Sequence, residues 1–232
     1  MSRAPLSLAA LLLLASGCLS LGPDANSNTL PFSFLDASAS WSFEVSDFPI
    51  ARTAEVAANG ELRPLPVSLG VAGNAQYESG NNVSGDLFLF HKAYRSGLTP
   101  LKTYHVSLQA TYATNYHAGC STGPGPHVVL KAGVLPTEPI ATPNAQGVWQ
   151  MNINKGAGTE HGDFVNLGDI RNGLSGCPAT GTYALRTTDR IRQSGDITTD
   201  QDGGFWMFVA TQSTALGSYE IFITELSVKI SY

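Results

Sequence analysis

The segment from Glu78 to Asp86 concentrates oxygen-bearing side chains, with Glu78, Asn81, Asn82 and Asp86 as its carboxylates and amides. Such groups are ligands that Ca²⁺ prefers. The same groups can hydrogen-bond to the hydroxyls of a sugar. Asn and Asp also bond their own backbone in turns. The segment is therefore a candidate ligand-binding loop, a candidate structural Ca²⁺ site or a plain turn, and the residues alone leave these alternatives open.

A second acidic segment, Asp200-Gln201-Asp202-Gly203, resembles the opening of a calcium-binding loop. A full loop of that kind has a third acidic or amide ligand and a closing Glu at a fixed spacing. The third Asp is absent here, and Glu220 lies too far along the chain. We therefore expect a hairpin turn between two strands, and we keep Asp200 and Asp202 only as a secondary loop candidate.

Motifs for catalysis are absent from the sequence. The five histidines show neither HExxH nor HxH spacing, and no Gly-x-Ser-x-Gly occurs. Carboxylates that could act in pairs in glycoside hydrolysis are present, but their separation depends on the fold. We assign no catalytic residue, leave the metal ligands open, and favour a non-catalytic role over an enzymatic one.

Aromatic side chains offer a second kind of candidate surface, because rings with a polar edge suit contact with sugars. We expect Trp206 to be buried among apolar neighbours, and Tyr94 and Tyr116 to be exposed near polar turns. The full set of aromatic candidates is Trp41, Trp149, Trp206, Tyr77, Tyr94, Tyr112 and Tyr116.

The first residues have the layout of a secretory signal peptide, which we assign to residues 1–17. Arg3 supplies the positive charge, Leu6 to Leu14 is apolar, and small residues precede Cys18. The apolar run is shorter than the about 20 residues that a membrane span needs. Ala15-Ser16-Gly17-Cys18 also resembles a lipobox, the bacterial lipoprotein motif, with Ala15 in place of the usual Leu. This resemblance implies lipidation of Cys18 and a membrane anchor, and Leu19 after the cysteine implies the outer membrane.

The cysteine count agrees with export. If Cys18 carries lipid, Cys120 and Cys177 remain as an even pair. Disulfides form in oxidising compartments, so we expect these two to be bonded. On the loop-entropy account such a bond stabilises the fold by about 4 kcal/mol.

Composition indicates one exported globular domain. Residues 18–30 are rich in Asn, Ser and Gly and predict a flexible tether, leaving 31–232 as a single domain. Hydrophobic residues make up 43% of the chain, which is enough for a core, and charged residues only 13%. The net charge of −5 and the lack of a basic cluster exclude a nucleic-acid partner.

Apolar and polar residues alternate with a period of two, which predicts an all-β fold. The alternation is clear over 104–112 and in two successive runs, 219–224 and 226–231. Continuous apolar runs at 87–90 and 205–209 predict strands buried on both faces. Turns are expected at Asn59-Gly60, Asn172-Gly173 and Asp202-Gly203. Further strands are expected at 32–35, 41–45, 128–134, 148–154, 164–167 and 182–187. Nine or ten short strands of this kind predict an antiparallel β-sandwich, jelly-roll-like, as in galactose-binding and other carbohydrate modules.

Several segments resemble a family of uncharacterised bacterial secreted proteins and lipoproteins. They are Ser79 to Phe90, Tyr104-His105-Val106, Ala113-Thr114-Asn115, Gly119-Cys120, Lys131-Ala132-Gly133, Glu138-Pro139 and Thr199 to Trp206. The resemblance covers most of the mature chain and implies an exported β-sandwich. It implies no activity and no site residues. A looser similarity to jelly-roll carbohydrate-binding modules concerns the fold only.

These observations predict an exported envelope lipoprotein whose sandwich domain binds a ligand through loops at one end. A glycan or an envelope protein is the candidate partner, and a structural Ca²⁺ is the one candidate cofactor. The alternatives are a hydrolase acting on an envelope polymer and a structural or assembly protein. A binding domain should show an exposed ring-lined groove, and an enzyme a cleft with a carboxylate or histidine of displaced pKa.

Overall fold

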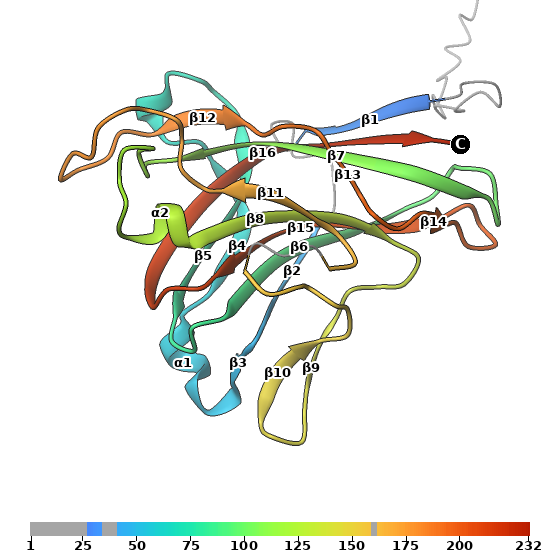
Figure 1. Ribbon diagram of the computed structural model, residues 1–232, viewed down its shortest axis with the longest axis horizontal. Helices are drawn as coiled ribbons and strands as arrows, with labels where there is room; N and C mark the ends of the chain where they lie inside the picture. The colour runs from blue at the N-terminus through green and yellow to red at the C-terminus, as the bar shows by residue number, and fades with distance from the viewer. Residues whose placement is uncertain (1–26, 34–40, 159–161) are drawn as a thin grey trace, which may run out of the picture.

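The computed structural model describes residues 27–33, 41–158 and 162–232, and its main feature is a pair of antiparallel sheets that face each other (Figure 1). The predicted signal peptide and Cys18 lie outside these residues. Among the described residues, no helix is long and apolar enough to cross a membrane.

The larger sheet has the order β12-β7-β16-β5-β4, with β16 in its centre. β1 also pairs with β16, and β13 and β14 continue the line of β12 along β7. Its strands are β1 (Ser27–Ser33), β4 (Asn59–Pro64), β5 (Asn74–Asn82), β7 (Thr103–Thr114), β12 (Ala184–Thr187), β13 (Ile191–Arg192), β14 (Ile197–Thr198) and β16 (Gly217–Ser231).

The second sheet has the order β11-β8-β15-β6-β2. Its strands are β2 (Ser42–Ser46), β6 (Leu87–Arg95), β8 (Val128–Leu135), β11 (Val165–Asp169) and β15 (Phe205–Ser213). The chain crosses between the sheets from β5 to β6, from β6 to β7, from β7 to β8 and from β15 to β16. This winding confirms the predicted antiparallel, jelly-roll-like sandwich.

A small third sheet and a few short helical turns lie at one end of the sandwich. The sheet consists of β3 (Phe48–Pro49), β9 (Ala141–Pro143) and β10 (Val148–Met151), in the order β3-β10-β9. The 3-10 turn η1 (Ile50–Arg52) and the one-turn helix α1 (Thr53–Val56) follow β3 directly. Figure 1 shows the β9–β10 hairpin projecting beside β3 and α1. The remaining turns are η2 (Val67–Leu69) and α2 (Pro124–His127).

The main core lies between the two large sheets, and smaller cores cover part of each outer face. Phe88, Phe90 and Phe208 on the outer face of the second sheet pack against Met151 and Phe164. Because both of its faces are covered, β6 is buried from Leu87 to Ala93, and β15 is buried over most of its length. The prediction of strands buried on both sides is confirmed for both segments.

The region around Glu78 to Asp86 departs from the predicted loop. Glu78, Asn81 and Asn82 belong to β5, and the turn to β6 begins only after Asn82. The Ser-, Gly- and Asn-rich sequence is a poor strand former, but β5 is paired on both sides, with β4 and with β16. Pairing and burial override the intrinsic preference of such residues.

Two smaller predictions also needed correction, and a third pattern gains an explanation. Asn59-Gly60 begins β4 instead of forming a turn, and Gly60 is required there because an added Cβ would collide with the Phe43 ring. The tether is shorter than predicted, because residues 27–30 already pair with β16. The two C-terminal alternating runs form one strand, whose register shifts between Ile223 and Glu225 where the alternation changes phase.

Candidate ligand-binding pocket

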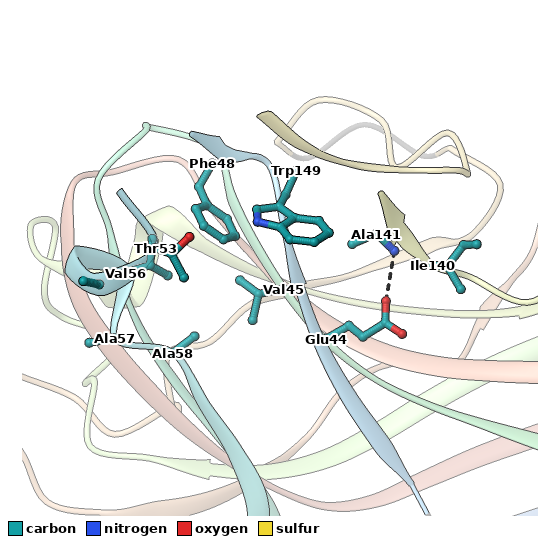
Figure 2. Close-up of a pocket in the computed structure, with 11 residues that line it drawn as sticks. Glu44, Val45, Phe48, Thr53, Val56, Ala57, Ala58, Ile140, Ala141 and Trp149 are labelled. Carbon is teal, nitrogen blue, oxygen red and sulfur yellow. Dashed lines mark hydrogen bonds between the residues drawn. The ribbon is translucent and has the colours of Figure 1, made fainter. Parts of the chain in front are cut away.

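A cavity of about 730 Å³ opens at the end of the sandwich between α1 and the β9–β10 hairpin (Figure 2). We call it the apolar pocket. It is lined by Glu44, Val45, Phe48, Thr53, Ala54, Val56, Ala57, Ala58, Ile140, Ala141 and Trp149. Small-molecule sites in proteins have volumes of about 300–1,000 Å³ and mostly apolar walls. The volume and the lining of this pocket both suit a small ligand.

Two aromatic rings form one wall of the apolar pocket. Phe48 in β3 and Trp149 in β10 are directly paired across the small sheet, so their side chains lie next to each other (Figure 2). Phe48 is buried, whereas Trp149 is half-buried and presents part of its indole to the cavity. The opposite edge comes from α1 and the residues after it, where Ala54 and Ala57 are exposed and Val56 is buried.

An ion-pair network centred on a buried lysine holds the hairpin side of the apolar pocket in place. Lys92 in β6 is 3% exposed, and its ammonium contacts the carboxylates of both Glu44 and Glu138. It also donates to the carbonyl of Pro139 over 2.9 Å. The second oxygen of Glu44 accepts the backbone N–H of Ala141 over 2.9 Å (Figure 2). The β2 strand is thereby tied to the start of β9.

Chemistry at the apolar pocket is limited by this network. Glu44 is the only ionisable residue in the lining, and each of its oxygens already has a partner. The Thr53 hydroxyl donates to the carbonyl of Ile50 over 2.7 Å. The lining thus contains no free pair of acid and base, and the arrangement suits binding better than catalysis.

A second cavity, of about 340 Å³, lies on the other side of Ala57, and we call it the polar pocket. Its lining residues are Ala57, Ser79, Gly80, Asn81, Asn115, Tyr116, Ser218, Tyr219 and Glu220. The Glu220 carboxylate is held by the hydroxyls of Tyr77 and Tyr183. The Tyr116 hydroxyl accepts the backbone N–H of Glu220 over 3.1 Å, and burial raises the pKa of Tyr116 to about 12.

The four residues of the predicted Glu78–Asp86 loop point to different places. Only Asn81 lines a pocket, the polar one. Asn82 is buried, donates to Ser213 and Ala215, and caps the turn to β6 through its side-chain oxygen. Asp86 contacts Lys155 and Gln212. These side chains do not converge, so the structure does not form the predicted Ca²⁺ site from them.

Glu78, the fourth member, faces the core between the sheets opposite His91 of β6. The Glu78 Oε2 and His91 Nε2 atoms are 3.9 Å apart, and both side chains are about fully buried, at 0% and 1% exposure. Neither oxygen of Glu78 makes a hydrogen bond of normal geometry among the described residues. Burial raises the pKa of Glu78 to about 8, which the Thr211 hydroxyl partly offsets. Burial also lowers the pKa of His91 to about 4, so both side chains are uncharged near neutral pH.

The secondary loop candidate is a turn stabilised by its own backbone. Asp200 accepts the N–H groups of Asp202 and Gly204 and the hydroxyl of Tyr94. The turn links β14 in one sheet to β15 in the other, so it is not the predicted hairpin. Across the described part of the chain, no group of three or more His, Cys, Asp or Glu side chains is arranged to hold a metal ion.

The disulfide prediction is confirmed, because Cys120 and Cys177 are bonded with a Cα–Cα distance of 4.8 Å. Among the aromatic candidates, Trp149 lines the apolar pocket and Tyr116 the polar one. Trp206 is half-buried instead of fully buried. The apolar pocket itself was missed, because its walls are ordinary alanine, valine and isoleucine side chains from two distant segments, 44–58 and 140–149. Trp149 was its only signal in the sequence.

Comparisons with known proteins place the chain in no family. No family model matches it, and no curated protein matches it significantly. The resemblance to secreted bacterial proteins therefore stays a prediction.

Solved structures that match over most of the chain are distant. The K1 cleaved adhesin domain of Lys-gingipain from Porphyromonas gingivalis W83 is 12% identical, with a TM-score of 0.39, and the match covers 87% of this chain and 97% of that one. A structure of carbohydrate-binding modules from the β-sandwich superfamily is 11% identical, with a TM-score of 0.38 and coverage of 83% and 58%. We draw no functional conclusion at this level of similarity.

Proposed function

We propose that this protein is a non-catalytic binding domain that takes up an apolar portion of its ligand in the apolar pocket. The observation that carries the proposal is the cavity itself, with Phe48 and Trp149 on one wall and alanines of the α1 segment on the other. Burying apolar ligand surface is favourable by about 25 cal/mol per Å². The tied Glu44 adds rigidity without leaving a free acid or base.

The lining of the apolar pocket narrows the class of expected ligands to molecules with an apolar part. A glycan alone would need several free hydrogen-bonding groups around the ring, and the apolar pocket does not supply them. An alkyl chain or a flat apolar ring fits its volume and its lining.

A displacement assay with a neutral apolar dye, N-phenyl-1-naphthylamine, tests this proposal. The purified chain should bind the dye saturably with one dye per chain, and 1-octanol should displace it. Ala54→Trp should weaken dye binding at least about tenfold, which is about 1.4 kcal/mol, because the exposed Ala54 lines the pocket and an indole there fills it.

The matched control is Ala51→Trp, which adds the same indole to an exposed residue of η1 outside the lining. This variant should bind the dye like the unmodified chain. Equal dye binding by both variants would contradict the proposal. Turnover of an envelope polymer by the chain would favour the hydrolase alternative instead.

The proposal includes export and a lipid anchor at Cys18. The signal-peptide layout of residues 1–17, the lipobox-like sequence and the disulfide all support it. Cys18→Ser should move the protein from the membrane fraction to the soluble fraction of a bacterial host. Continued sedimentation of this variant with membranes would rule out the anchor.

A further inference from the structure

The apolar and polar pockets are adjacent, because Ala57 lines both of them. Ala57 is the residue that ends α1; its side chain is exposed, and its backbone is left-handed, with φ 45°. Figure 2 places it at the edge of the apolar pocket, across from Ile140 and Ala141. Ala57 is the one residue that the two linings have in common. A ligand that extends past Ala57 from the apolar pocket therefore reaches the polar pocket.

The polar pocket contains both hydrogen-bond donors and hydrogen-bond acceptors. Asn81 and Asn115 carry amides, and Ser79 and Ser218 carry hydroxyls. The side-chain oxygen of Asn115 is buried and has no hydrogen-bond partner among the described residues. A hydroxyl both donates and accepts, so a hydroxyl-rich group suits this mixture.

The Glu220 carboxylate makes the choice of ligand more specific. Two tyrosine hydroxyls fix its position, and each of its oxygens keeps a second lone pair for another donor. Asn81 is also positioned, because its side-chain amide donates to the carbonyl of Glu55 in α1 over 3.0 Å. Lys and Arg are absent from the lining, and the carboxylate would repel a phosphate or sulfate. A neutral polyhydroxylated group therefore fits the polar pocket better than an anion.

We infer that the ligand is amphipathic, with an alkyl or other apolar part in the apolar pocket and a neutral, hydroxyl-rich head in the polar pocket, joined across Ala57. An acylated or alkylated sugar belongs to this class. The inference rests on the proposed function, because it extends the same site by its polar neighbour. It also gives the predicted glycan partner a place, as the head of a larger molecule.

Calorimetric titration of the full chain with octyl glycosides below their micelle concentration tests this inference. The heads are glucose, galactose and N-acetylglucosamine, and the reference ligands are 1-octanol and the three free sugars. At least one octyl glycoside should bind about tenfold or more tightly than 1-octanol, which is about 1.4 kcal/mol.

Variants assign this gain to the polar pocket. Asn115→Ala and Ser218→Ala should each remove most of the gain for the glycoside and leave 1-octanol binding unchanged. Ala54→Trp should weaken the binding of both the glycoside and 1-octanol. Ser194→Ala, an exposed serine outside both linings, is the matched control and should change neither. Thermal unfolding of each variant shows whether the fold is intact.

Three results would overturn the inference, and they separate it from the proposed function. Equal affinity for all octyl glycosides and 1-octanol would mean that only the apolar pocket binds and that the sugar head makes no contribution. Binding of a free sugar that Ala54→Trp does not disturb, without a glycoside gain, would mean two independent sites. Failure of 1-octanol and every glycoside to bind would remove the inference and the proposed function together.

Discussion

His91 and Lys92 are neighbours in β6, and they place ionisable groups on opposite faces of the same sheet. His91 points into the core between the sheets, towards Glu78. Lys92 points to the outer face, where Glu44 and Glu138 meet it. Both side chains are buried, at 1% and 3% exposure. The inner pair, Glu78 and His91, is accommodated because both groups are uncharged. The outer group, Lys92, is accommodated because its charge is paired with two carboxylates.

The difference follows from what surrounds each residue. Phe43 lies 5.0 Å from the His91 ring, and the neighbouring Tyr219 and Thr211 hydroxyls bond each other. Such surroundings favour neutral forms. Lys92 instead reaches carboxylates that keep 31% and 44% of their side chains in solvent, so their charges stay hydrated. Only the outer group contributes to the candidate site, because only Lys92 is linked to the wall of the apolar pocket.

The largest expected effect comes from removing the partners of Lys92. The double variant Glu44→Gln/Glu138→Gln leaves a buried ammonium without a counter-charge, which costs about 3–5 kcal/mol of unfolding free energy. Lys92→Met should cost less, about 1–3 kcal/mol, because the two carboxylates can hydrate. Urea unfolding measures both values.

Glu55→Gln, in an exposed ion pair with Arg52, is the control for that comparison. It should change the stability only slightly, because both side chains of this ion pair are exposed to solvent. If Lys92→Met destabilises the domain as much as the double variant, the buried ammonium is not the dominant cost.

The inner pair predicts a pH dependence of intermediate size. Glu78 keeps its proton in the fold up to about pH 8, whereas the ordinary pKa of a glutamate is 4.5, so stability falls as the pH rises through this range. His91 has a folded pKa of about 4 against an ordinary 6.5, so its contribution falls as the pH drops from 6.5 to 4. Between pH 4.5 and 6.5 the opposite effects of Glu78 and His91 on the unfolding free energy cancel. Above pH 6.5 only the titration of Glu78 changes the stability. Stability should therefore drop by on the order of 2 kcal/mol from pH 6.5 to 8.

Glu78→Gln should remove most of this drop, because the amide does not ionise. Urea unfolding at pH 6.5 and pH 8 gives the difference for each chain. The exposed Glu61→Gln variant should keep the full drop. An unchanged drop in Glu78→Gln would show that another group is responsible.

The smallest expected effect is that of His91→Phe at pH 6.5. An aromatic ring is kept at this position, and the main loss is one hydrogen bond to the backbone of Tyr77, about 1 kcal/mol. The pH profile should change more clearly than the stability. Without His91, stability should fall steadily from about pH 4.5 upward instead of staying level to pH 6.5. A level region retained in this variant would show that His91 is not the group whose titration offsets that of Glu78.

The sequence predicted the sandwich because its strands carry the signal locally. In β7, inward residues such as Val106 and Leu108 alternate with half-exposed ones, and this pattern does not depend on the partner strands. β5 carries no such signal. From the sequence, Glu78 was interpreted as a ligand on a surface loop. Only the pairing of β5 with β4 and β16 places it in the core. The apolar pocket was beyond prediction for a related reason, since its shape depends on how two segments about a hundred residues apart meet.

The position of β16 also sets an order of events for the growing chain. This strand is the centre of the larger sheet and pairs with β1, β5 and β7, yet it is the last strand in the sequence. A ribosome delivers it after every partner, so the larger sheet cannot close while its final strand is still being made. Until β16 is made, β1, β5 and β7 lack the strand that joins them, so the larger sheet is completed only at the end of the synthesis of this domain.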